Sequence, residues 1–332
     1  MSASDRCCLG WRPTRFVLVA CLVLALTGLL GRSAMAQAPK AAGPDEPATD
    51  APEKPKPDET AKPAAKAPVK PAAKAAPGEP YLEEKVDPKP EKRLTILGLL
   101  RKGKVTAEQW ARIAKYYGEY ALPRWTVVAN RANVAKWRNE LADDIAQAVP
   151  PVREQLLAFL LPKLVDMVKK NYHPVTRVNA MLMIGRLNAQ EPPTRFGSDP
   201  PVALPEAQPH LLAALVDPQV PDAAHPKLPD AVKVAALVGI KRHAELGAVT
   251  TPEQRAAATA ALLGLATTEA PPAGRSAAPH AWMRALAIEA LGALKDPGAG
   301  GKVAKALLGI AGQAGAPLTL RCAAAGALGK LT

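Results

Sequence analysis

The chain has 332 residues, of which 48% are hydrophobic but only 4% aromatic, and its formal net charge is +13. This apolar share, with 22% charged residues, excludes disorder along the whole length, and four cysteines are too few for a disulfide-dense mini-domain. A core with so few large side chains must form between helices that approach each other through alanine, glycine and leucine.

Residues 1–36 have the pattern of an export signal. Three arginines precede an apolar run at 16–30, and Ala34-Met35-Ala36 provides a small-x-small cleavage site before Gln37. The run is shorter than the about 20 residues that a membrane span needs. We therefore expect cleavage after residue 36 and export to the periplasm, the cell envelope or the medium. An uncleaved anchor and lipidation at Cys21 are the two alternatives, and membrane contact is expected only in those cases.

Residues 37–93 are rich in alanine, proline and lysine and contain few branched or aromatic side chains. Their 11 basic residues balance 11 acidic ones. Such a segment cannot offset the entropy of ordering, and its frequent prolines favour extended polyproline conformations. We expect a disordered, neutral linker that acts as a spacer or spans a layer of the envelope.

Residues 94–150 are predicted to form an N-terminal helical capping region. Thr106-Ala107-Glu108-Gln109 is a capping box that opens a helix. The segment 94–186 has a net charge of +8, and its basic residues are interspersed with aromatic ones. That pattern is typical of a capping bundle with an aromatic core, or of a module that binds an anionic glycan or nucleic acid. The candidate residues for polyanion binding are Arg124, Arg131, Lys136 and Arg138.

Residues 151–332 show helical periodicity and an internal repeat. An apolar stripe predicts a helix at 152–170, in which Pro162 should cause a kink or a restart. Later helices share a template in which a basic residue is followed by a small residue after three positions and an aliphatic one after seven. The template begins at Arg177, Lys233, Arg284 and Arg321, which predicts helices at 174–187, 230–242, 280–294 and 318–331. Partner helices are expected before the last three of these, at 206–216, 252–267 and 302–312.

The stretches AWMRALAIEALGALKDP at 281–297 and LRCAAAGALG at 320–329 resemble HEAT-like repeats of the phycobilisome-lyase type. The resemblance covers about residues 151–332 and implies an all-α fold, an α-solenoid of helical hairpins whose second helices line a concave surface. It also implies that polar residues on those second helices face a protein partner. The candidates are Arg177, Lys233, Arg284 and Arg321. From the residues alone, these side chains are instead surface groups whose stems lie on neighbouring helices.

The sequence contains no recognisable catalytic pattern. It lacks a nucleophile elbow, a zinc-protease motif, a phosphate-binding glycine loop and a dinucleotide fingerprint. The histidines have no metal-ligand spacing, and Cys322, the only cysteine after residue 36, is expected to be a small buried residue. We therefore expect no catalytic, cofactor-binding or metal-binding residues. The sequence predicts a non-enzymatic, exported scaffold that binds another protein; the alternatives are a polyanion-binding module and an enzyme whose side chains are scattered.

Overall fold

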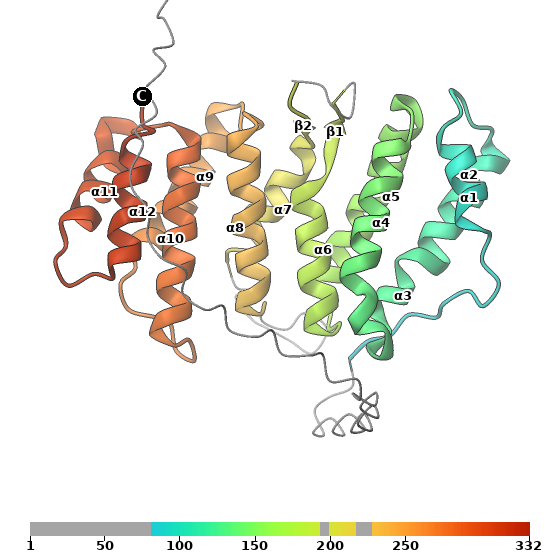
Figure 1. Cartoon of the computed structure of the whole chain (residues 1–332), viewed down its shortest axis with the longest axis horizontal. Helices are drawn as coiled ribbons and strands as arrows, with labels where there is room; N and C mark the ends of the chain where they lie inside the picture. The colour runs from blue at the N-terminus through green and yellow to red at the C-terminus, as the bar shows by residue number, and fades with distance from the viewer. Residues whose placement is uncertain (1–80, 193–198, 217–227) are drawn as a thin grey trace, which may run out of the picture. The chain divides into compact units, whose positions relative to one another are not determined.

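The computed structural model describes residues 81–192, 199–216 and 228–332 (Figure 1). The predicted export signal and most of the predicted linker lie outside these residues. The described part is mostly helical, as the sequence predicts. Its strands are confined to a short antiparallel pair, β1 (Asn188–Gln190) and β2 (Val202–Ala203). No helix within the described ranges is long and apolar enough to cross a membrane.

The N-terminal region, residues 81–149, is built around aromatic side chains. Its helices are α1 (Arg93–Leu100), α2 (Ala107–Tyr116), α3 (Pro123–Thr126) and α4 (Val134–Gln147), with a π-turn at Tyr117–Ala121 and a 3-10 turn at Val128–Asn133. The predicted capping box at Thr106 is confirmed, because its side chain accepts a hydrogen bond from the Gln109 backbone N–H at 3.2 Å. Tyr117 and Trp125 are each 1% exposed, so these aromatic rings form the core of the region.

The chain before α1 is already attached to the helices. Backbone N–H groups of Leu82 and Glu84 donate to the carbonyl of Asn171 at 2.9 Å and to Thr126 Oγ1 at 2.8 Å. The ring of Tyr81 packs edge-on against His173, with 4.9 Å between ring centroids. The predicted end of the linker at residue 93 is therefore placed too far along the chain. Residues 81–92 hold an aromatic ring and acidic groups that find partners.

The helices of the repeated region, residues 150–332, agree closely with those predicted. They are α5 (Pro150–Lys169), α6 (Pro174–Arg186), α7 (Gln208–Ala213), α8 (Asp230–Glu245), α9 (Pro252–Thr267), α10 (Ala277–Leu294), α11 (Lys302–Gly312) and α12 (Leu318–Leu328). The helix predicted at 206–216 is shorter, with a 3-10 turn at Pro205–Ala207 in front of it. Helix α5 continues through Pro162 without a restart, and buried leucines lie on both sides of the proline.

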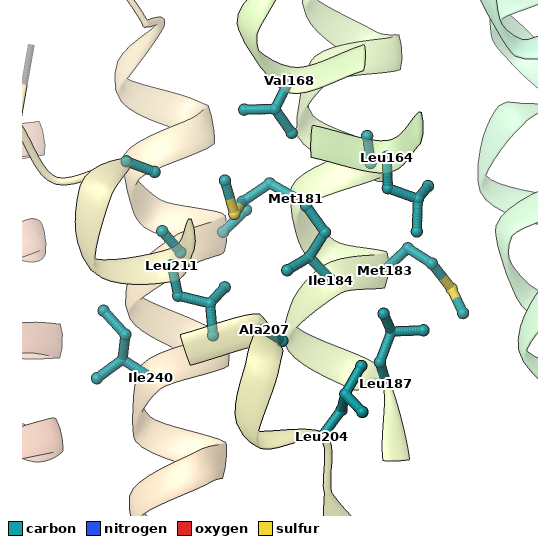
Figure 2. Packing of buried hydrophobic residues seen from close by; sticks show 14 of the residues in the cluster. Leu164, Val168, Met181, Met183, Ile184, Leu187, Leu204, Ala207, Leu211 and Ile240 are labelled. Atoms are coloured by element: carbon teal, nitrogen blue, oxygen red, sulfur yellow. The ribbon is translucent and has the colours of Figure 1, made fainter. Parts of the chain in front are cut away.

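The helices pack in pairs and in rows. Each of α6, α8, α10 and α12 contacts the helix before it, and these four helices also contact one another in chain order. Helix α4 contacts α6, so the row begins in the N-terminal region (Figure 1). Between α5, α6, α7 and α8 the core is aliphatic and contains the fully buried Leu164, Ile184, Leu211 and Ile240 (Figure 2).

Small residues bring neighbouring helices into close contact, as expected. A Cβ added to Gly185 on α6 would lie 2.7 Å from the Cα of Gly239 on α8, and one added to Gly292 on α10 would lie 2.9 Å from the Cα of Ala327 on α12. Only glycine permits backbones to approach so closely. Cys322, however, is exposed rather than buried, because α12 packs against α10 through its other side.

Candidate functional site

The basic residues of the repeat template point into the fold. Arg177 is 3% and Arg284 6% exposed, and burial lowers the pKa of both guanidinium groups. Carbonyls in the last turn of a helix lack intrahelical partners, and a cation there also complements the helix dipole. The arginines donate their Nε–H groups to such carbonyls of the preceding helix: Arg177 to Val168 at 2.8 Å, Arg284 to Ala266 at 2.9 Å and Arg321 to Ala311 at 3.1 Å.

The fourth template residue, Lys233, is 5% exposed and lines a cavity of about 310 Å³ between α7, α8, α9 and α10. Arg275 and His280 line the same cavity. Arg275 pairs with Asp230 at 2.6 Å, and its other N–H faces His280 Nδ1 at 3.3 Å, which ties the loop before α10 to the start of α8. The resemblance implies that Lys233 and the three template arginines face a partner. Arg177, Lys233 and Arg284 are instead buried and Arg321 is half-buried, so these side chains present little area to a partner.

Of the four candidates for polyanion binding, the structure brings Arg124 and Lys136 together, since both pair with Glu140. The Arg124 guanidinium lies 5.1 Å from the Tyr120 ring centroid and 4.3 Å from the centroid of Trp137, and it pairs with Glu140 at 3.2 Å. This side chain is therefore part of the packing rather than a free contact. Arg131 and Lys136 are exposed, whereas Arg138 reaches across to α6 and donates to Asn179 Oδ1 at 3.0 Å.

The side of α6, α8 and α10 that faces away from their paired helices is partly exposed, and we call it the outward face. Residues two before, and two, five and nine after, each template residue lie about 140–200° around the helix from it. Because the template arginines contact the preceding helix, these positions point away from it. They are Val175, Asn179, Leu182 and Arg186 on α6; Ala231, Ala235, Val238 and Arg242 on α8; and Trp282, Leu286, Glu289 and Ala293 on α10.

The outward face carries an apolar band. Trp282 on α10 is 56% exposed and Val238 on α8 is 44% exposed. Val175, Leu182 and Leu286 are half-buried on the same face. A single exposed hydrophobic residue is normal on a protein surface, but several apolar residues on one face of three adjacent helices are typical of an interaction surface.

Three arginines from adjacent helices form a second feature of this face, the arginine row: Arg138 on α4, Arg186 on α6 and Arg242 on α8. Burial lowers the pKa of Arg138 and Arg242, and the charge of Arg186 lowers both further. Their hydrogen bonds go to neutral oxygens: Arg138 to Asn179, Arg186 to Asn139 Oδ1 at 3.2 Å, and Arg242 to the carbonyl of Gly185 at 3.3 Å and to Asn188 Oδ1 at 2.5 Å. Within the described residues none of the three forms an ion pair, although the charge of Glu191 acts on Arg242.

Arg186 and Arg242 were not among the residues selected from the sequence. Each lies nine residues after a template residue, two and a half turns along the helix and therefore on its opposite side. The repeat pattern thus contained the signal, but the template residue itself is the one that the fold buries.

A search of protein-family models, of curated proteins and of solved structures finds no match to this chain. Across the described ranges, no group of three His, Cys, Asp or Glu side chains is arranged to hold a metal ion. The outward face is the surface on which the exposed apolar and basic residues of several helices come together.

Proposed function

We propose that this protein is an exported, non-enzymatic scaffold that binds another protein through the outward face of α6, α8 and α10. The observation that carries the proposal is the exposure of two apolar side chains on the outward face of neighbouring helices, Trp282 on α10 at 56% and Val238 on α8 at 44%. Tryptophan is enriched among the residues that dominate binding energy in protein interfaces. Covering the band with a partner removes this apolar area from water, which favours association.

We infer that the repeated region is an α-solenoid of HEAT-like hairpins. Two observations support this: each template helix packs on the helix before it, and successive template helices contact each other in order. In such an array each hairpin buries its apolar face against its neighbours, and the row of second helices provides one continuous binding surface. The outward face is then the surface that the resemblance assigns to partner binding.

Export is supported by the basic, apolar and small-residue pattern of residues 1–36, followed by a charge-balanced linker. The absence of a catalytic motif from the sequence supports a binding role rather than a chemical one. A scaffold on a linker of this kind reaches its partner at a distance from the point of attachment or release.

A second candidate function is the binding of an anionic glycan or nucleic acid, which the arginine row together with the exposed Arg131 and Lys136 favours. The two functions differ in their response to salt. Binding through neutralised phosphates or sulfates weakens steeply as salt rises, whereas a contact centred on the apolar band does not.

Site-specific photo-crosslinking tests the scaffold function. A photoreactive phenylalanine analogue replaces Trp282 or Val238 in the full chain expressed in its own host, and the control carries it at Leu308 on α11, which is 66% exposed. The expected result is the same protein adduct from positions 282 and 238 and no such adduct from 308. Adducts that are absent from 282 and 238, or equal at all three positions, would count against this face as the binding surface.

A further inference from the structure

We propose that the arginine row, Arg138, Arg186 and Arg242, binds the carboxylates of an acidic segment of the protein partner. This inference rests on the proposed scaffold function and names the chemistry of the partner. It places an electrostatic contact beside the apolar band on the same face, where Leu182 and Val238 lie five residues after the template residues of α6 and α8.

The charge balance of the row calls for an anion. A guanidinium presents five N–H donors in a planar fork, and here hydrogen bonds to neutral amide or carbonyl oxygens occupy one or two of them in each arginine. Arg186 lies close enough to Arg138 and Arg242 for its charge to lower the pKa of both. A carboxylate bound between neighbouring members replaces this repulsion with attraction and uses the free donors in charge-assisted hydrogen bonds.

The spacing of the row suits a chain of carboxylates better than one small anion. The three arginines stand on α4, α6 and α8, and packed helices have axes about 8–10 Å apart. In an extended peptide, side chains on one face recur about every 6.6–6.8 Å. Long arginine side chains bridge the remaining difference, so successive acidic residues of an extended segment reach successive arginines.

The surroundings favour a protein segment over a nucleic acid. Single-stranded nucleic acids are held by aromatic side chains on which bases stack, in addition to basic groups. On α6 and α8 the outward residues one turn before Arg186 and Arg242 are Leu182 and Val238, which are aliphatic. Trp137 on α4 is already covered by the Arg124 guanidinium. Aliphatic surface next to arginines fits a peptide that alternates acidic and apolar residues.

Fluorescence anisotropy with a labelled octaglutamate peptide tests the row in the full chain. Arg186→Gln removes the exposed central member, and Arg242→Gln removes one whose bonds also join α8 to α6 and to β1. We expect each variant to weaken binding at least about tenfold, as loss of charge-assisted hydrogen bonds implies. Arg131→Gln and Lys305→Gln remove exposed cations outside the row and are expected to change the affinity less than about twofold. Unchanged thermal unfolding of Arg186→Gln shows that the variant is folded.

The outcomes separate this inference from the proposed function. No octaglutamate binding, or equal loss from Arg131→Gln and Arg186→Gln, overturns the row as a site, even if position 282 still yields its adduct. Tighter, row-dependent binding of an oligothymidylate of eight nucleotides overturns the choice of a protein segment. Row-dependent octaglutamate binding without any adduct at 282 and 238 supports the row and overturns the scaffold function. If the row binds an acidic segment and the outward face binds the partner, Arg186→Gln also reduces the yield of the adduct at position 282.

Discussion

The N-terminal region and the repeated region solve the same packing problem with different residues. In the N-terminal region, large rings such as Tyr117 and Trp125 fill the space between short helices. In the repeated region, long helices come together until glycines such as Gly185 and Gly239 touch. A chain with 4% aromatic residues thus concentrates its buried rings where helices diverge and uses small residues where they run side by side.

Buried polar groups differ between the regions in the same way. Asp144 on α4 is 3% exposed and accepts from Arg93 Nε at 2.9 Å and from the Tyr117 hydroxyl at 3.0 Å. Burial raises the pKa of this carboxyl, and the bonds from Arg93 and Tyr117 oppose the rise. His243 on α8 is fully buried, and neither ring nitrogen has a hydrogen-bond partner in the described part of the chain. The buried Asp144 of the N-terminal region is therefore a paired polar group, whereas His243 of the repeated region is an unpaired one.

The largest expected loss of stability follows from a substitution that disrupts the aromatic core. Trp125→Ala removes a side chain that is 1% exposed, and we expect the free energy of unfolding to fall by about 3–5 kcal/mol, from lost burial and the cavity left behind. Trp282→Ala is the matched control, because its ring is 56% exposed, and it should cost less than about 1 kcal/mol. Urea unfolding measures both. Similar losses in the two variants would show that the N-terminal region does not depend on its rings.

The next effect is a dependence on pH that the repeated region should show. Burial, helped by the charge of Arg242, lowers the pKa of His243 to about 4, whereas the unfolded chain titrates near its usual value of 6.5. Between these values the unfolded state binds a proton that the folded state does not. The contribution of His243 is therefore complete above pH 6.5 and is lost as pH falls toward 4, by about 3 kcal/mol.

Urea unfolding at pH 7.5 and 4.5 measures this loss, and His243→Phe isolates it, since carboxylates titrate alike in both proteins. We expect the variant to lose less stability on acidification than the wild-type protein. Parallel losses in the two proteins would mean that His243 is solvated or paired in the folded state.

The sequence predicted the features that depend on residues close together in the chain better than those that depend on packing between helices. Capping boxes, apolar stripes and the repeat template are local, and they placed α6 and α8 to α12 within a few residues. The direction of a side chain around its helix depends on which neighbour packs where. The template arginines were therefore assigned to a surface although they bind carbonyls of the preceding helix, and the arginine row across three helices was not found.

The attachment of residues 81–92 was missed for a related reason. Composition alone assigned these residues to the linker, yet Tyr81 and Glu84 find partners, His173 and Tyr172, in the loop between α5 and α6. Such partners lie about 90 residues away in sequence, and no local pattern predicts them.

The smallest effects contrast two kinds of helical glycine. Gly185→Ala places a methyl group 2.7 Å from the Cα of Gly239, where only backbone movement makes room, and we expect a loss of about 1–3 kcal/mol. A Cβ on Gly309 of α11 meets nothing within 4 Å, and neither does one on Gly264 of α9, which stands in the same Leu-Leu-Gly context. At these two positions alanine should raise stability by about 0.5–1 kcal/mol, because it restricts the unfolded chain and favours the helix. Thermal unfolding of the three variants compares them directly. A stabilising Gly185→Ala would mean that α6 and α8 lie further apart in solution, and it would remove the basis for the contrast between a region packed by rings and one packed by glycines.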